Sequence, residues 1–131
     1  MSAIYLDASA FLKLVVEEDE SQPLRDYLGG EHGRYASSAL LRTEAFRAGA
    51  RHGPEALGAV RNALGRIDLV AIDDRILDTA GHLHPRVSRS LDAIHVATAL
   101  AIGDDLDVVV TYDQRMIEAT SLLGVPTATP Y

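Results

Sequence analysis

Short apolar segments alternate with helical segments from one end of the chain to the other, and this alternation constrains the fold more than any other feature. The expected strands are residues 3–6, 34–37, 69–72, 107–112 and 125–129. The expected helices are residues 8–16, 21–28, 38–52, 55–66, 74–83, 91–102 and 113–123. Strands that alternate with helices of about ten or more residues are typical of βαβ units and a mainly parallel sheet. The order of the segments therefore predicts an α/β fold.

The length and composition are those of an ordinary globular protein. The chain has 131 residues, 47% of them hydrophobic and 24% charged, and we expect a single domain over residues 1–131. The absence of cysteine excludes a disulfide framework, a thiolate zinc site and a cysteine nucleophile. No apolar run approaches the roughly 20 residues of a membrane span, and the first residues lack a basic signal-peptide segment. These features predict a cytoplasmic protein with no membrane association.

The charged residues narrow the possible functions. The net charge of −7 has the wrong sign for tight non-specific binding to nucleic acid by the protein alone. Lys13 is the single lysine, and no G-x-x-x-x-G-K-[ST] phosphate loop is present. Because Lys13 follows Asp7 so closely, it is poorly placed to act as the late-strand lysine of a receiver domain or of a haloacid-dehalogenase-type phosphatase.

Two aspartates directly follow predicted strands. Asp7 comes after the first strand, and Asp113 comes after the strongest late strand. Either aspartate alone is best interpreted as a helix N-cap. In an open parallel sheet, however, ligands bind outside the carboxyl ends of the strands, where the winding reverses. The two side chains would meet there if their strands are neighbours.

Glu44 occupies an unusual position on its predicted helix. On a helical wheel it falls in the middle of an apolar stripe, whereas a solvated glutamate belongs on the opposite face. The stripe consists of Leu40, Leu41, Ala45 and Ala48. A carboxylate that faces inward needs a cation or a proton, so this position favours a functional role.

Asp92 opens an almost wholly apolar helix, which predicts that the helix packs deeply with its N-terminus near the end of the sheet. The alternative is an aspartate that complements the helix dipole, with Ser90 as the cap. His95, one turn later, is interpreted as a packed, hydrogen-bonded histidine rather than a ligand or a base. The remaining histidines are interpreted as surface residues: His32, His52, His82 and His84.

Four converging carboxylates cannot all be ionised and unpaired. A hard divalent cation resolves this conflict, and ligation by oxygen alone suits Mg²⁺ or Mn²⁺ rather than zinc. Such a cation can polarise a phosphodiester and stabilise its leaving oxygen. The acidic residues therefore indicate cation-dependent chemistry on a phosphodiester.

Four sequence features, in this order, resemble the PIN-domain ribonucleases, and specifically the VapC toxins of bacterial type II toxin–antitoxin systems. They are IYLDASA at residues 4–10, the inward Glu44, LDAIHVATA at residues 91–99 and VTYDQRM at residues 110–116. The resemblance covers essentially the whole chain. It implies a three-layer α/β/α sandwich around a mainly parallel sheet. It also implies an endoribonuclease that depends on Mg²⁺ or Mn²⁺ and usually forms a homodimer.

The resemblance also implies roles for particular residues. It carries the family's catalytic and metal-binding acids over to Asp7, Glu44, Asp92 and Asp113. Ser9 would help to position a water on the metal, and Thr111 occupies a second supporting position. Arg115 would reach a phosphate of bound RNA, or else would be a surface arginine paired with an acidic neighbour. The expected partners are the RNA substrate and a cognate VapB-type antitoxin that blocks the site.

Two other functions compete with this prediction. An aspartyl-nucleophile phosphatase also has an aspartate after its first strand, but it needs a second aspartate where this chain has Ser9, and a downstream lysine. A non-catalytic module could instead use the acidic groove to bind a basic peptide. The intact carboxylates at all four positions argue against this module.

Overall fold

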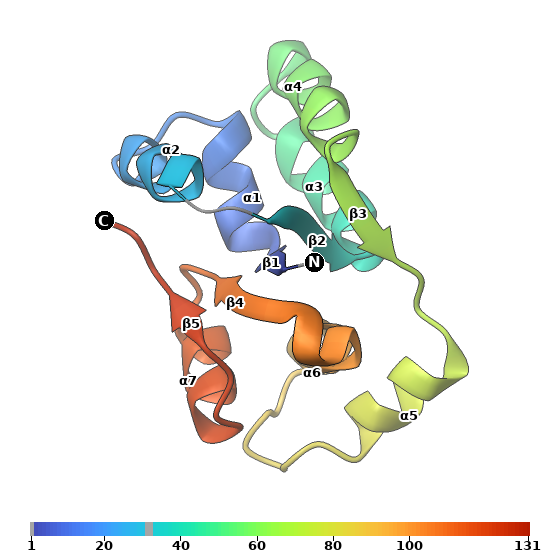
Figure 1. Ribbon diagram of the computed structural model, residues 1–131. Helices are drawn as coiled ribbons and strands as arrows, with labels where there is room; N and C mark the ends of the chain where they lie inside the picture. Colours follow the sequence, from blue (N-terminus) through green and yellow to red (C-terminus); the bar gives the residue numbers. More distant parts are fainter. Residues whose placement is uncertain (1, 31–32) are drawn as a thin grey trace.

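The computed structural model describes residues 2–30 and 33–131, so His32 lies outside the described residues. Its centre is a five-stranded parallel sheet in the order β3-β2-β1-β4-β5 (Figure 1). The strands are β1 (Ala3–Leu6), β2 (Arg34–Ser38), β3 (Ile67–Val70), β4 (Leu106–Val110) and β5 (Thr127–Ala128). The mainly parallel sheet predicted from the alternating segments is confirmed.

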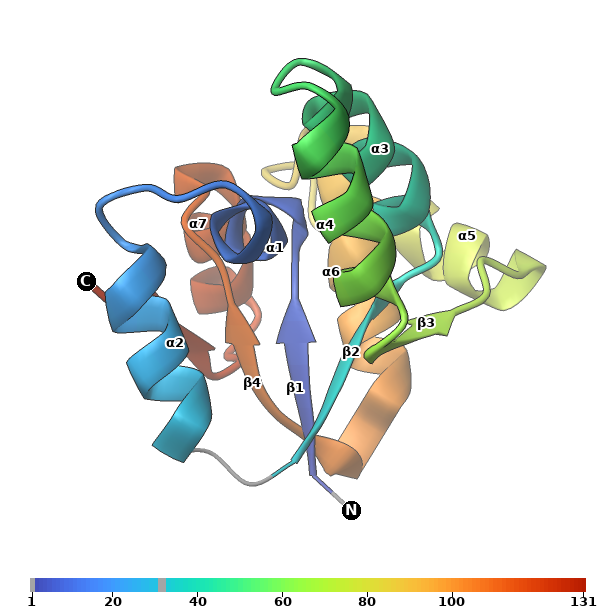
Figure 2. The same ribbon diagram turned by 90° about the horizontal axis from the view of Figure 1, so that it is seen from above.

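Helices cover both faces of the sheet and complete a three-layer α/β/α sandwich. They are α1 (Ala8–Val15), α2 (Ser21–Gly30), α3 (Leu40–Ala50), α4 (Pro54–Leu64), α5 (Asp74–Gly81), α6 (Ser90–Ile102) and α7 (Gln114–Leu122), with a short 3₁₀ turn, η1 (Gly103–Asp105), before β4. Helices α1 to α4 lie on one face, and α5 to α7 lie on the other (Figures 1 and 2). None of the helices in the described ranges has the length and apolar character needed to cross a membrane.

The hydrophobic core is divided by the sheet into two parts. Ile4 and Leu6 of β1 pack with Phe11 of α1 on one face. Tyr5, between them in sequence, points to the other face and packs with Val96 of α6. Because helices cover both faces, the central strand β1 is apolar and buried along its whole length rather than alternating in polarity.

The sheet changes its direction of winding at β1. From β1 the chain proceeds outward to β2 and β3, and β4 then returns to the opposite side of β1. The first strand and the strongest late strand are therefore neighbours, as the site prediction required. Their carboxyl ends form the topological switch point at which open α/β sheets bind ligands.

The third strand lies two residues earlier than predicted, at Ile67–Val70 instead of 69–72. Ile67 is buried and pairs with Tyr35 of β2. Pairing with β2 therefore determines where this strand begins, whereas the apolar run alone favours the later start.

Most of the predicted helix boundaries also differ from the structure by one or two residues, as at α3 and α2. The helix expected over residues 38–52 begins at Leu40, because Ser38 is the last residue of β2. The Ser38 hydroxyl accepts a hydrogen bond from the Leu40 amide at 3.1 Å, so it lies at the junction between strand and helix. The second helix was expected to end at Leu28, but it continues through two glycines to Gly30.

Candidate active site

Asp7 lies at the carboxyl end of β1, where it is 3% exposed and serves as the N-cap of α1. Its Oδ1 atom accepts hydrogen bonds from the Ser9 hydroxyl at 2.6 Å and from the Ala10 amide at 3.0 Å. The Thr111 hydroxyl donates to Oδ2. Burial raises the pKa of Asp7, although these hydrogen-bond donors act to lower it. The N-cap interpretation is confirmed, and the cap is a carboxylate whose charge is poorly solvated.

Two hydroxyl groups join the end of β1 to the end of β4. The Ser9 oxygen accepts a hydrogen bond from the Tyr112 amide at 2.8 Å. The oxygen of Thr111, which is fully buried, accepts one from the Asp113 amide at 3.1 Å. Because both hydroxyls also donate to Asp7, that carboxylate is held from the first turn of α1 and from the segment that follows β4. In the structure, the two predicted supporting residues contact Asp7 directly.

Asp113 and Asp92 lie at the N-terminal ends of α7 and α6. Asp113 caps α7, with its Oδ1 atom accepting a hydrogen bond from the Arg115 amide at 2.9 Å. Burial raises the pKa of Asp92, and the negative charge of Asp113 raises it further. Asp113 and Asp92 are therefore close enough to repel one another.

The expected cap at Ser90 is wrong, because Ser90 is the first helical residue and Arg89 occupies the N-cap position.

Arg115 projects from α7 near Asp92. The positive charge of Arg115 acts to lower the pKa of Asp92. Both residues line a small cleft together with Arg86 and Glu118. Arg115 is exposed. It therefore has an acidic neighbour while its guanidinium stays accessible to a ligand.

Glu44 and His95 form a hydrogen-bonded pair between α3 and α6. The distance from His95 Nε2 to Glu44 Oε1 is 2.6 Å, and the two side chains are 4% and 24% exposed respectively. On the other side of the imidazole ring, Nδ1 lies 2.6 Å from the Tyr5 hydroxyl of β1. His95 is thus confirmed as a packed, hydrogen-bonded histidine. The partner of the inward Glu44 in this structure is an imidazole.

Tyr5 was not among the site residues predicted from the sequence. It lies 90 positions from His95, so no local motif connects the two residues. One signal was present: alternate residues of a strand face opposite sides of a sheet. This alternation places Tyr5 on the face covered by α6, away from Ile4 and Leu6.

The predicted acids lie around the ends of β1 and β4. His95 contacts Glu44 and lies near both Asp7 and Asp92, while the negative charge of Asp113 acts on Asp92. Within the described ranges, no three acidic or imidazole side chains are close enough to hold a metal ion as they stand. The available carboxylate oxygens match the donors that Mg²⁺ and Mn²⁺ prefer. The chemistry of the donor set therefore fits such a cation, although the ligands are not already gathered around one point.

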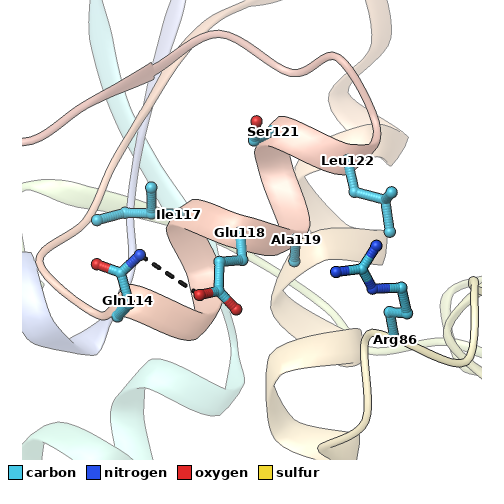
Figure 3. A pocket seen from close by; sticks show the side chains of 7 residues that line it. All are labelled: Arg86, Gln114, Ile117, Glu118, Ala119, Ser121 and Leu122. Carbon is cyan, nitrogen blue, oxygen red and sulfur yellow. Dashed lines mark hydrogen bonds between the residues drawn. The ribbon is translucent and has the colours of Figure 1, made fainter.

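A separate pocket lies against α7 (Figure 3). Its lining includes Gln114 and Glu118 of the helix, and Arg86 reaches toward it from the loop before α6. The Gln114 amide nitrogen is 3.5 Å from Glu118 Oε1. None of the four predicted acids lines this pocket. It adjoins the cleft of Asp92 and Arg115, with which it shares Arg86 and Glu118.

The PIN domain family matches residues 4–122, and the chain belongs to this family. Among curated proteins, the chain is 50% identical over 130 residues to Ribonuclease VapC46 of Mycobacterium tuberculosis, with 99% of each protein covered. It is 42% identical over 130 residues to Ribonuclease VapC35 of the same organism, with 97% of this chain and 96% of the relative covered.

Solved structures with the same fold come from more distant sequences. A toxin–antitoxin complex from Klebsiella pneumoniae contains a chain that matches with a TM-score of 0.75 at 20% identity, covering 99% of this chain and 98% of that one. A chain of VapBC2 from Rickettsia felis, bound to a DNA fragment from its promoter, matches with a TM-score of 0.74 at 12% identity, with 98% and 99% covered. At these identities, the matches establish the fold.

Proposed function

We propose that the protein is an endoribonuclease toxin that cleaves RNA phosphodiester bonds with Mg²⁺ or Mn²⁺. The observation that carries the proposal is the environment of Asp7, a buried carboxylate at the switch point of a parallel sheet. Its pKa is raised by burial, so a bound cation would stabilise its charged form. Similarity over nearly the full length to curated ribonucleases supports RNA as the substrate.

The proposed catalytic and metal-binding residues are Asp7, Glu44, Asp92 and Asp113. When bound, the cation would supply positive charge beside the scissile phosphate and would lower the pKa of an attacking water. The chain holds the ligands for this purpose. Ser9 in the first turn of α1 and Thr111 directly after β4 both donate hydrogen bonds to Asp7. The negative charges of Asp92 and Asp113 repel one another, and a bound cation would neutralise them.

Arg115 is the proposed contact for a phosphate of the RNA. Its guanidinium is exposed beside Asp92, where it can offer two parallel donors to phosphate oxygens. The net charge of −7 makes much of the surface unfavourable for RNA. Cationic groups beside the acids are therefore needed to hold the substrate.

The proposed protein partner is a cognate VapB-type antitoxin. Two proteins with the same fold are described as toxin–antitoxin or VapBC assemblies, which supports this expectation. An arginine of the antitoxin, inserted among Asp7, Glu44 and Asp92, would neutralise their charge and block the site. A purified complex that left these carboxylates open and the enzyme fully active would contradict this mode of inhibition. We also propose a homodimer that acts in the cytoplasm.

The proposed domain comprises residues 1–131 as one PIN domain. The family match extends over residues 4–122. Strand β1 near the start and strand β5 near the end belong to one sheet.

Mapping of new RNA 5′ ends after induction in cells tests the proposed function. We expect the parent protein to generate new ends and the Asp7→Asn variant to generate none. The purified parent should cut the same sites with Mg²⁺ or Mn²⁺, poorly with Ca²⁺ and not with EDTA. Undiminished cleavage in EDTA would contradict the metal dependence. Release of inorganic phosphate without cleavage of the RNA chain would instead favour a phosphatase, and binding without any reaction would favour a non-catalytic module.

A further inference from the structure

A series of three hydrogen-bonded side chains joins the two helix layers beside the candidate site. Helix α3 packs on one face of the sheet through Leu41, and α6 packs on the other through Val96 (Figure 1). Glu44 of α3 nevertheless reaches His95 of α6 at 2.6 Å, and His95 reaches Tyr5 of β1 at 2.6 Å. The His95 ring is therefore fixed between the central strand and the opposite helix layer.

The donors in this series follow from the chemistry of the two end groups. An ionised carboxylate only accepts hydrogen bonds, so the contact with Glu44 requires a hydrogen on His95 Nε2. A neutral imidazole with its hydrogen on Nε2 accepts a hydrogen bond at Nδ1, and the Tyr5 hydroxyl lies 2.6 Å away as the donor. The ring is held in the tautomer that presents an Nε2–H group to Glu44.

This contact restricts a side chain that would otherwise be mobile. Glu44 is only partly buried, and a glutamate loses considerable rotamer entropy when it is held in one conformation. Among the described residues, the hydrogen bond found for Glu44 uses Oε1. The second carboxylate oxygen, Oε2, is left to bind a cation.

We propose that His95 is a positioning residue, which holds Glu44 in the orientation required for cation binding while Tyr5 fixes the tautomer of the His95 ring. The inference rests on the proposed function of the same site. Partners of this kind around metal ligands typically contribute a factor of about 10 to 100 in metal affinity or activity. His95 and Tyr5 would act through Glu44 rather than by touching the substrate.

Two substitutions at His95 separate positioning from packing. Glutamine places its amide nitrogen near the position of Nε2 and can still donate to Glu44, whereas asparagine reaches only as far as Nδ1. Calorimetric titration of Mn²⁺ into the metal-free protein measures the difference. We expect His95→Asn to weaken Mn²⁺ binding about 10-fold or more and His95→Gln to stay within about threefold of the parent. Tyr5→Phe should cause a smaller loss, and the exposed His52→Asn should cause none.

A double-mutant cycle with Glu44→Gln tests whether His95 affects Mn²⁺ binding through Glu44. If His95 acts through Glu44, His95→Asn should weaken Mn²⁺ binding little further in the Glu44→Gln protein. An equal loss in both backgrounds would overturn the proposal, as would a folded His95→Asn protein that binds Mn²⁺ like the parent. If thermal melting shows that His95→Asn does not fold, the same cycle with Tyr5→Phe decides by the same criterion.

RNA cleavage tests the proposed ribonuclease function, and it does so independently of the role of His95 in Mn²⁺ binding. A parent protein that binds Mn²⁺ with the expected coupling but cleaves no RNA would contradict the ribonuclease proposal and leave the role of His95 supported. A parent that cleaves RNA but lacks the coupling between His95 and Glu44 would overturn the role of His95 alone.

Discussion

At Asp7, burial and hydrogen bonding act in opposite directions on one carboxylate. Donors from Ser9, Ala10 and Thr111 stabilise the ionised form, yet the pKa remains raised because burial has the larger effect. An aspartate that served only as a helix cap would be more stable in contact with water. The ionised Asp7 carboxylate is therefore unfavourable in the folded protein unless a cation binds to it or it takes up a proton.

The first prediction concerns the pH dependence of stability in EDTA. Because the folded-state pKa of Asp7 lies above its ordinary value of 3.8, the folded protein binds more protons than the unfolded chain above that pH. Stability should therefore fall as the pH rises from that value through the raised pKa. Asp7→Asn keeps an oxygen for the cap and removes the titration. Its melting temperature should depend less on pH, and its RNA cleavage should be lost.

Thermal melting between about pH 4 and pH 8 measures this difference. The control is Asp104→Asn, which removes an exposed carboxylate at the opposite end of the sheet, before β4. Melting curves for the parent and Asp7→Asn that run parallel across the range would contradict the assignment of this pH dependence to Asp7.

A second prediction contrasts Asp92 with Glu44. In the metal-free protein, Asp92→Asn should raise the melting temperature slightly, because burial and the charge of Asp113 oppose ionisation of Asp92 more than Arg115 favours it. Glu44→Gln should give no such gain, because His95 already donates a hydrogen bond to that carboxylate. Both substitutions should abolish cleavage. The comparison requires melting in EDTA beside an RNA cleavage assay, and a destabilised Asp92→Asn protein would contradict it.

At the scale of the elements, hydrophobic periodicity was sufficient to predict the type and order of the strands and helices. It was insufficient where pairing decides a boundary. The apolar run at residues 69–72 favours a later strand, but the pairing of Ile67 with Tyr35 moves β3 two residues toward the N-terminus. Contacts between distant segments set this register, and they leave no local pattern in the sequence.

The candidate site shows the same division between local and distant information. The position of Glu44 on the apolar stripe of its helix correctly indicated an inward-facing acid, because helical periodicity is local. Its partner His95 and the third member Tyr5 come from two other elements, brought together by the sheet order. Tyr5 could only have been identified with knowledge of which helix covers each face of β1.

The third prediction concerns the link between β1 and β4. Thr111→Val removes a buried hydroxyl that donates to Asp7 and accepts from the Asp113 amide. Leaving a buried polar group without its partner costs about 1–3 kcal/mol, so chemical denaturation should show a loss of this size. Cleavage should fall as well, because Asp7 loses a contact that fixes it. Thr111→Ser should restore most of both properties.

Thr98→Val provides the matched control for this substitution. Thr98 is also fully buried, but its hydroxyl donates to the Ile94 carbonyl within the same helix, at 2.6 Å. We expect a smaller loss of stability and little change in cleavage. Equal effects of Thr98→Val and Thr111→Val on cleavage would indicate a general loss of packing rather than a specific link between the strands.

At the scale of the whole molecule, an acidic protein with a net charge of −7 gathers unfavourable carboxylates at one end of its sheet. A cation that binds there stabilises the folded state and has no equivalent site in the unfolded chain. At a concentration about 100 times its dissociation constant, this binding contributes about 2.7 kcal/mol. For a domain of this size, we expect the melting temperature to rise by roughly 10 °C.

The fourth prediction is that Mn²⁺ or Mg²⁺ raises the melting temperature of the parent much more than that of Asp7→Asn. Asp7 is the buried acid that gains most from the cation, so its substitution should remove most of the increase. Asp104→Asn changes the net charge equally but removes an exposed carboxylate outside the proposed site, so its increase should match that of the parent. Melting is followed as the metal concentration rises at constant ionic strength, because surface charges are screened by added salt. Equal increases for the parent and Asp7→Asn would place the stabilising cation elsewhere and contradict a metal site at the ends of β1 and β4.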